Sequence, residues 1–597
     1  MDEQLNRVRF NIESAKAYTE GWHKNIDFWR NLYNGKHYRK TPLPGEVQFN
    51  DPTHTNTVDL AVGIMLSNPI SWKATGWKPG ADMQRLESQV EKFIIGVMES
   101  NIDKNEYDTN YEVLLHYVRD GGCVLYTVWD EDRAKAYKSK TTVIDQQGQE
   151  FEVPIYEKCP IVQQVVDPST VYFLPGGNSK WLAVVRVEKV SLFDIKTKFG
   201  KLPTAYAHMD NSSISQLIAQ KGMLYDYWDT VESDKGKVVI RNATLFDNEF
   251  IPGRELKEMK KYKSIPYTLG LYKPTDRFDT SKWQSIITPL VEPVTYLEKN
   301  INRRQRQIDM YSSLPLIAKT QSGREVTLDP GLGKIANISQ DEDIAFPVWP
   351  GNPPDVERQI DFARSRVQQS GFSDVFIGSG ASQVSGFSLS QLGDQNRIRL
   401  EQPVAHLKRF WEWAGEKAVE VALENAEPGS FISVYGMIRG EPFASMVMIE
   451  ELRGFHITCN IQPNFPNDQV RKHAMGNQVR GILSEETIME RYLDIQQPDD
   501  EYDRKILEMT QTHPLTIQFS IMKVLEERAQ GGDEIAAAVI QNFQQQGVQG
   551  QPGAPKQPQN FEQGLGVPQA GAAQVGNQPN NSPFEDATGN PNMAGGV

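Results

Sequence analysis

Three adjacent carboxylates, Asp341, Glu342 and Asp343, have the residue types and spacing that metal chemistry requires. Carboxylate oxygens are the ligands that Mg²⁺ prefers, and a nuclease would use such a group for metal-dependent hydrolysis. The stretch around them is punctuated by prolines, so we expect a β-turn, where adjacent carboxylates are usually a solvated surface. We therefore expect no metal ion here and keep a metal-dependent DNA-processing enzyme as an alternative function.

A second group is basic. Lys299, Arg303 and Arg306 recur at intervals of four and three residues, with Arg304 beside them. This spacing places three positive charges on one face of a helix. A solvated helix face is the simplest interpretation, and contact with a nucleic-acid backbone is the other. In a ring of identical subunits the charges would form a belt whose fields add.

Other catalytic signatures are missing from the sequence. It contains no GxxxxGK[ST] phosphate loop, no HExxH helix and no GxSxG turn, and its nine histidines show no zinc-site spacing. Cys123, Cys159 and Cys459 lie far apart and form no CxxC pair, which predicts neither a disulfide framework nor a zinc ribbon. We expect no enzymatic activity, no cofactor and no metal.

The composition, with 39% hydrophobic and 23% charged residues among 597, predicts several soluble globular domains. A net charge of −14 disfavours a protein that grips nucleic acid by neutralising phosphates, although DNA could still slide past it. The longest apolar run, residues 60–66, is far shorter than the ~20 residues of a membrane span, and the N-terminus carries no apolar signal segment. We therefore expect neither secretion nor membrane insertion.

The elements that position these groups follow from hydrophobic periodicity. The first 130 residues read as helices, beginning with 2–32, where Trp22, Ile26 and Trp29 recur at helical spacing. The other expected helices are 57–67, 82–100 and 105–119. Strands then dominate to about residue 275, at 123–129, 161–166, 171–174, 182–187, 237–246 and 267–272. Helices and strands do not alternate regularly, which predicts an α+β fold.

The second half is organised around long helices. An apolar stripe begins a helix near residue 287; its members are Leu290, Val294, Leu297 and Ile301. A β-like interval with expected strands at 334–338 and 345–348 separates this helix from the next, 355–369. A Gly/Ser-rich loop leads to an amphipathic helix, 389–425, which Pro403 should kink or locally break.

The remaining C-terminal sequence predicts a half-buried strand over 455–461 and helices over 468–528. Residues 531–597 are rich in Gln, Gly, Asn and Pro and poor in large apolar side chains. Such a composition cannot bury enough surface to offset the entropy of ordering, so we expect a disordered tail that is dispensable for folding.

This order of elements resembles the portal proteins, the head-to-tail connectors of tailed bacteriophages. QSGFSDVFIGSGASQVSGFSLSQL, residues 369–392, is similar to the helix end, tunnel loop and start of the kinked helix in that family. FHITCNIQPNFPNDQVRKHAMGNQVRGILSEETIMERYL, residues 455–493, resembles the returning wing strand and the helix starts that follow it. VVDPSTVYFLP, residues 165–175, looks like a wing strand turn.

The resemblance implies an α+β, portal-like architecture with an α/β wing, helical stem, small β-rich clip, long kinked helix, helical crown and disordered C-terminal tail. The expected parts are the wing (1–285), a stem helix (286–313), the clip (314–353), a second stem helix (354–372), the wing return with tunnel loop and long helix (373–465), the crown (466–530) and the tail (531–597).

The resemblance also implies a function. Portal proteins form rings, usually of twelve subunits, at one capsid vertex of the virion, and double-stranded DNA is packaged and ejected through the ring. The large terminase and later a head-completion adaptor dock on the clip, and major capsid and scaffold proteins are further partners; assembly takes place in the host cytoplasm. The expected DNA-channel residues are Ser379, Ser382, Gln383, Val384 and Ser385 in the tunnel loop and Lys299, Arg303 and Arg306 in the stem. Another virion structural protein, such as a shell or tail component, is the remaining alternative.

Overall fold

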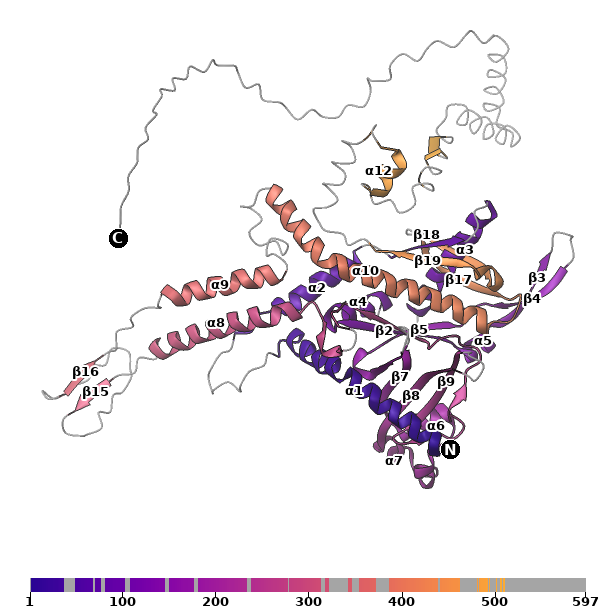
Figure 1. The fold of residues 1–597 in the computed structure, drawn as a ribbon, viewed down its shortest axis with the longest axis horizontal. Coiled ribbons are helices and arrows are strands. Elements are labelled where there is room, and N and C mark those ends of the chain that lie inside the picture. The colour runs from indigo at the N-terminus through magenta and orange to yellow at the C-terminus, as the bar shows by residue number, and fades with distance from the viewer. Residues whose placement is uncertain are drawn as a thin grey trace, which may run out of the picture. The chain divides into compact units, whose positions relative to one another are not determined.

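The computed structural model describes residues 2–36, 49–67, 70–76, 81–102, 108–144, 150–176, 181–232, 238–276, 279–312, 317–320, 342–345, 354–371, 386–438, 441–461, 480, 483–491, 493, 501, 505–506 and 508–509 (Figure 1). The chain divides into two units, Met1–Pro498 and Asp499–Val597. In the second unit the described positions, Glu501, Lys505, Ile506, Glu508 and Met509, are helical. The elements that follow belong to the first unit.

The helices are α1 (Asp2–Tyr33), α2 (Thr53–Leu66), α3 (Ala81–Ile102), α4 (Thr109–Arg119), α5 (Glu131–Ala136), α6 (Leu192–Phe199), α7 (Ile214–Ala219), α8 (Val291–Ser312), α9 (Pro354–Ser370), α10 (Gly386–Asn425) and α12 (Glu485–Arg491). The sequence predicted the longer ones to within a few residues. Long periodic stripes leave little ambiguity about helix type, and α1 shows this best: Trp22, Ile26 and Trp29 are all buried.

Within the described residues the strands form six sheets. The largest, with the order β10-β9-β8-β7-β6 and β11 paired to β9, contains β6 (Val171–Pro175), β7 (Trp181–Ser191), β8 (Lys221–Glu232), β9 (Val238–Phe246), β10 (Glu249–Phe250) and β11 (Lys257–Glu258). The sheet β12-β2-β5 contains β2 (Gly122–Trp129), β5 (Ile161–Val166) and β12 (Tyr267–Leu271). The sheet β18-β17-β4-β3 contains β3 (Lys138–Ile144), β4 (Glu150–Tyr156), β17 (Phe431–Ile438) and β18 (Glu441–Met448).

The two-stranded sheets pair β1 (Ser71–Gly76) with β19 (Phe455–Asn460), β13 (Lys273–Pro274) with β14 (Trp283–Gln284), and β15 (Ile317–Thr320) with β16 (Glu342–Ala345). All pairings between these strands are antiparallel except that of β17 with β4. The fold is therefore α+β, as the sequence predicts.

Helix α1 covers one face of the large sheet. Val8, Ile12 and Ala15 pack on alternate residues of its strands, including Ala183 and Tyr227. The strand period of two puts these positions on one face, so the intervening residues must face the other way. That second face lies against the β12-β2-β5 sheet, as hydrogen bonds of Arg186 to Gln164 and of Tyr267 to Asp226 show. Helix α10 packs on β2, β12 and β19.

A buried carboxylate joins α1 to the end of α4. Asp120 is 0% exposed and accepts hydrogen bonds from Arg30 Nη2 at 2.7 Å, Arg119 Nε at 2.8 Å and His116 Nδ1 at 2.7 Å. Arg30 also reaches Asp167 at 2.6 Å. Burial alone would raise the pKa of Asp120, but hydrogen bonds from His116, Arg119 and Arg30 outweigh it and hold that pKa well below its usual range.

Several sequence predictions need correction. Helix α10 continues through Pro403, so the local break is wrong, and the kink stays a prediction. Helix α10 also begins at Gly386, so the end of the expected loop is helical. Of the strand expected at 345–348 only Ala345 is described, and it belongs to β16. Glu342 and Asp343 also lie in β16 rather than in a turn. The strand expected at 334–338 and residues 531–597 lie outside the described residues, and the boundaries of the parts remain predictions.

Candidate nucleic-acid interface

The basic stripe lies on the exposed side of α8. Lys299, Arg303 and Arg306 are exposed, and the aromatic ring of Tyr296 is 43% exposed on the same face. At 1.5 Å of rise per residue the three charges span about 10 Å along the helix, which is about one screening length in physiological salt. The three side chains therefore act on an approaching polyanion as one site.

Helix α9 fixes which way this stripe faces. Helices α8 and α9 lie side by side (Figure 1) and close on their own apolar core, to which α8 contributes Val294 and Leu297 and α9 contributes Ile360, Ala363 and Val367. The apolar stripe predicted from the sequence is therefore covered within the chain. It is therefore not a free surface for a neighbouring subunit.

The hairpin carries more basic residues than this stripe: Arg304, which the sequence analysis placed beside it, and three arginines of α9 that the sequence analysis missed. Arg304 is tied to Glu357 of α9 by an ion pair of 2.9 Å, so it links the two helices. Arg358, Arg364 and Arg366 are exposed on α9. These three arginines are irregularly spaced and lie among acidic residues, so the sequence shows no basic stripe on α9. The hairpin is nevertheless richer in positive charge than a chain of net charge −14 would lead one to expect.

Hydrogen bonds to main-chain atoms hold α8 to the segment that precedes α2. The buried carboxylate of Glu298 accepts from the backbone N–H of Asp51 at 2.7 Å. Asn302 accepts from the N–H of Phe49 at 2.8 Å and donates to its carbonyl at 3.3 Å. These contacts fix the position of α8 at the level of the basic stripe.

The end of α9 is held by Arg399 of α10. Its guanidinium donates to the carbonyl oxygens of Gln369 and Gly371, where α9 terminates. A cation that binds the last carbonyls of a helix also interacts favourably with the helix dipole. A cavity of about 460 Å³ adjoins this contact. Arg399 was not predicted, because its partners are backbone atoms.

The structure adds little on the two other predicted sites, the tunnel loop and the acidic group at 341–343. Ser379, Ser382, Gln383, Val384 and Ser385 lie outside the described residues, between Gly371 and the start of α10. Glu342 and Asp343 stand opposite Thr320 and Lys319 in the β15–β16 pairing, and within the described part of the chain no group of three or more His, Cys, Asp or Glu could hold a metal ion. Asp341 is outside the described residues.

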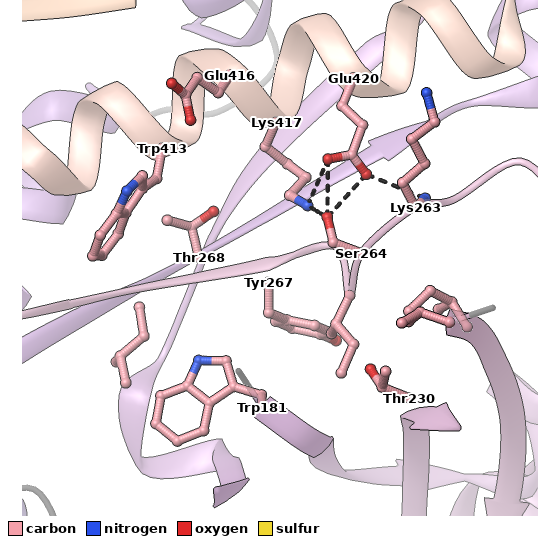
Figure 2. Close-up of a pocket in the computed structure, with 14 residues that line it drawn as sticks. Trp181, Thr230, Lys263, Ser264, Tyr267, Thr268, Trp413, Glu416, Lys417 and Glu420 are labelled. Carbon is pink, nitrogen blue, oxygen red and sulfur yellow. Dashed lines mark hydrogen bonds and ion pairs between the residues drawn. The ribbon is translucent and has the colours of Figure 1, made fainter. Parts of the chain in front are cut away.

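A second cavity, of about 410 Å³, contains a serine beside a lysine (Figure 2). Lys417 of α10 donates to Ser264 and lies 3.2 Å from Glu420, and Ser264 Oγ is 2.9 Å from both Glu420 oxygens. Burial lowers the pKa of Lys417, and Glu420 offsets part of that shift. A serine–lysine pair can serve nucleophilic catalysis when the lysine is an unpaired base. Here both side chains bond to Glu420, so the group binds residues 263–264 to α10.

Comparisons with known proteins were made with the whole chain. No protein-family model matches it, and no curated protein matches it. Among solved structures, the neck of an empty GTA particle computed with C6 symmetry is similar at a TM-score of 0.36 and 9% identity, over 74% of this chain and 89% of that chain. This similarity is too low to carry a functional argument, which therefore depends on the chain's own elements.

Proposed function

We propose that this chain is a structural protein of a phage-like virion and, within that class, the portal protein that forms a ring at one capsid vertex. One observation carries the proposal: a two-helix hairpin with a β pair between its helices leads, after residues 372–385, into the 40-residue helix α10 (Figure 1). This is the order of stem, clip, stem, loop and long helix that the resemblance implies.

The surface of the hairpin supports a channel role. Three of the exposed side chains on α8, Lys299, Arg303 and Arg306, are basic, whereas the chain as a whole is acidic. Repeated around an axis, the stripe of Lys299, Arg303 and Arg306 would form a positive belt on a negative ring. DNA would then be attracted to the channel without the multiple phosphate contacts that slow sliding.

Partners follow from the same proposal. Double-stranded DNA passes through the ring, and the large terminase and a head-completion adaptor dock at the β15–β16 end of the hairpin. Major capsid and scaffold proteins surround the wing. Deletion of residues 314–348 with a short linker should leave the body folded and abolish terminase capture, whereas retained capture would place the docking site elsewhere.

The decisive experiment is imaging of the purified protein. Negative-stain micrographs and light scattering at micromolar concentration should show closed rings with an axial hole. The absence of rings across salt and pH would contradict the proposal. Sheets, shells or tubes would instead favour another virion structural protein.

Within the described residues, no helix combines the length and the hydropathy needed to cross a bilayer.

A portal should lack nuclease activity. Incubation of the protein with plasmid DNA and Mg²⁺ or Mn²⁺ should leave the plasmid intact, and an Asp343→Asn variant is the matched control for any cleavage that is seen. Cleavage by the wild type but not by the variant would favour the metal-dependent enzyme.

The predicted tunnel loop can be tested separately. Replacing both Gln383→Lys and Ser385→Lys should slow packaging while rings still assemble; an unchanged packaging rate would place the loop away from DNA.

A further inference from the structure

A cavity of about 640 Å³ lies between the large sheet and strand β2. This volume is within the range of sites that take small molecules. Packed sheets usually bury apolar side chains between them, yet here Arg186, Asp226 and Asn242 line the space from three neighbouring strands. The strand register places Arg186 opposite Asp226. A polar row therefore crosses the sheet inside the body.

The hydrogen bonds in this row leave polar groups open. Asp226 accepts from Trp228 Nε1 at 3.0 Å, Asn242 Nδ2 at 2.8 Å and Tyr267 Oη at 3.1 Å, so its carboxylate is well satisfied. Asn242 Nδ2 also donates to the Tyr227 carbonyl at 3.1 Å. Its Oδ1 accepts from no other described residue and remains available as an acceptor.

A donor lies nearby. Gln164 Oε1 accepts from Arg186 Nη1 at 3.3 Å, and no described residue accepts from Gln164 Nε2. Arg186 is held further by an ion pair with Glu188. The open amide donor on β5 and the open amide acceptor on β9 both line the cavity. Such a pair can recognise the edge of a heterocycle, as amide side chains do with bases.

Aromatic rings supply the other walls. Tyr126, Trp129, Trp228 and Tyr262 line the cavity, and the rings of Trp228 and Tyr262 meet edge to face with centroids 5.5 Å apart. Stacking on aromatic side chains is worth about 1–3 kcal/mol per base where proteins bind single-stranded nucleic acid. The walls therefore favour a planar ligand.

The exposed side of the cavity is basic. Lys198 Nζ and the Arg254 guanidinium each lie 5.6 Å from the centroid of the Phe199 ring. Among the described residues neither has an ion-pair partner. The cavity has three basic side chains against two acidic ones, in a chain whose net charge is −14. Two cations beside one ring suit a multiply charged anion such as a phosphate.

We propose that this cavity binds a free nucleotide, with the base between the aromatic side chains and the phosphate at Lys198 and Arg254. The amide groups of Gln164 and Asn242 meet the edge of the base. Duplex DNA is not the ligand, because its bases are paired and stacked. The site is separate from the basic stripe on α8 and does not depend on ring formation.

The test is calorimetric titration of the full-length protein with deoxyadenosine monophosphate. Saturable binding is expected, and it should raise the thermal unfolding midpoint. Deoxyadenosine and inorganic phosphate, tested separately, should each bind at least about tenfold more weakly, because each lacks one of the two recognised groups. Equal binding of phosphate alone would overturn the proposal, as would the absence of saturable binding or competition by duplex DNA.

Charge reversal at the rim of the cavity tests whether the nucleotide binds at this site or is attracted only by the overall charge of the protein. Arg254→Glu should weaken nucleotide binding by about tenfold or more, since it replaces an attractive contact with a repulsive one. Lys189→Glu is the matched control: it is exposed on the same sheet, makes the same charge change and does not line the cavity. Equal losses in both variants would contradict the assignment. Gln164→Ala should lower affinity for the nucleotide while leaving the weak binding of phosphate unchanged.

Discussion

Replacement of Asp120 by Asn tests the buried network that joins α1 to α4. The variant keeps the shape of the side chain but removes a negative charge that is 0% exposed and faces Arg30, Arg119 and His116. Arg30 retains Asp167, whereas Arg119, whose side chain is only 14% exposed, loses its ion pair with Asp120. Breaking one side of a buried ion pair costs about 3–5 kcal/mol. We expect the lower end of that range and a thermal midpoint roughly 5 °C lower.

The pH dependence gives the sharper measurement. Because the pKa of Asp120 is well below its usual range in the folded protein, its contribution is fully present above the unfolded value of about 3.9 and is lost as the pH falls toward the folded value. Thermal unfolding followed from pH 7 to pH 3 should therefore show a constant gap between wild type and variant down to about pH 5. The gap should narrow below pH 4.

Asp132→Asn is the control, since Asp132 is exposed in the first turn of α5. It should change stability by no more than about 0.5 kcal/mol. A variant at Asp120 that is as stable as the wild type, or a gap that stays the same at pH 3, would refute the account of the network.

Three further predictions concern the hairpin and its anchor. Leu297→Ala should destabilise the α8–α9 core by about 2–5 kcal/mol, seen as faster proteolysis of the hairpin while the body resists. Charge reversal of Lys299, Arg303 and Arg306 together should lower the salt dependence of DNA binding by about three phosphate contacts in an anisotropy titration, and an unchanged slope would remove the stripe from the interface. Arg399→Ala should raise amide hydrogen exchange at the end of α9 without unfolding α10; unchanged exchange would show that the contact does not hold the helix end.

Sequence reasoning succeeded where one face of an element is apolar and the other polar. The hairpin is the best case: Val294 and Leu297 were placed on one face and Lys299 and Arg303 on another, and the structure confirms both. When a helix has one apolar and one polar face, its sequence predicts which face is buried as well as that it is a helix.

Elements buried on both faces were missed. Strand β8 carries Tyr225 and Tyr227 toward α1 while Asp226 and Trp228 face the other sheet, so it shows no polar and apolar alternation. Strand β17 was missed for another reason. It is uncharged and largely apolar over 431–438, and its exposed face carries Tyr435 and Met437, which are 41% and 58% exposed, so the sequence does not mark that face as polar. Arg399 binds backbone carbonyl oxygens. Because every residue has a backbone carbonyl, no particular side chain in the sequence marks the partner of such a contact.

The anchors at the base of the hairpin have a mechanical consequence. Glu298 and Asn302 bind backbone atoms of residues 49–51, and Arg399 binds the last carbonyls of α9. A pull along α9 is therefore shared with α10 through a charged side chain, and a pull along α8 is shared with the chain ahead of α2. Helices α8 and α9 are thus attached to different parts of the body. Tilting the hairpin would have to break contacts at both helices, so it cannot rotate freely about one attachment point.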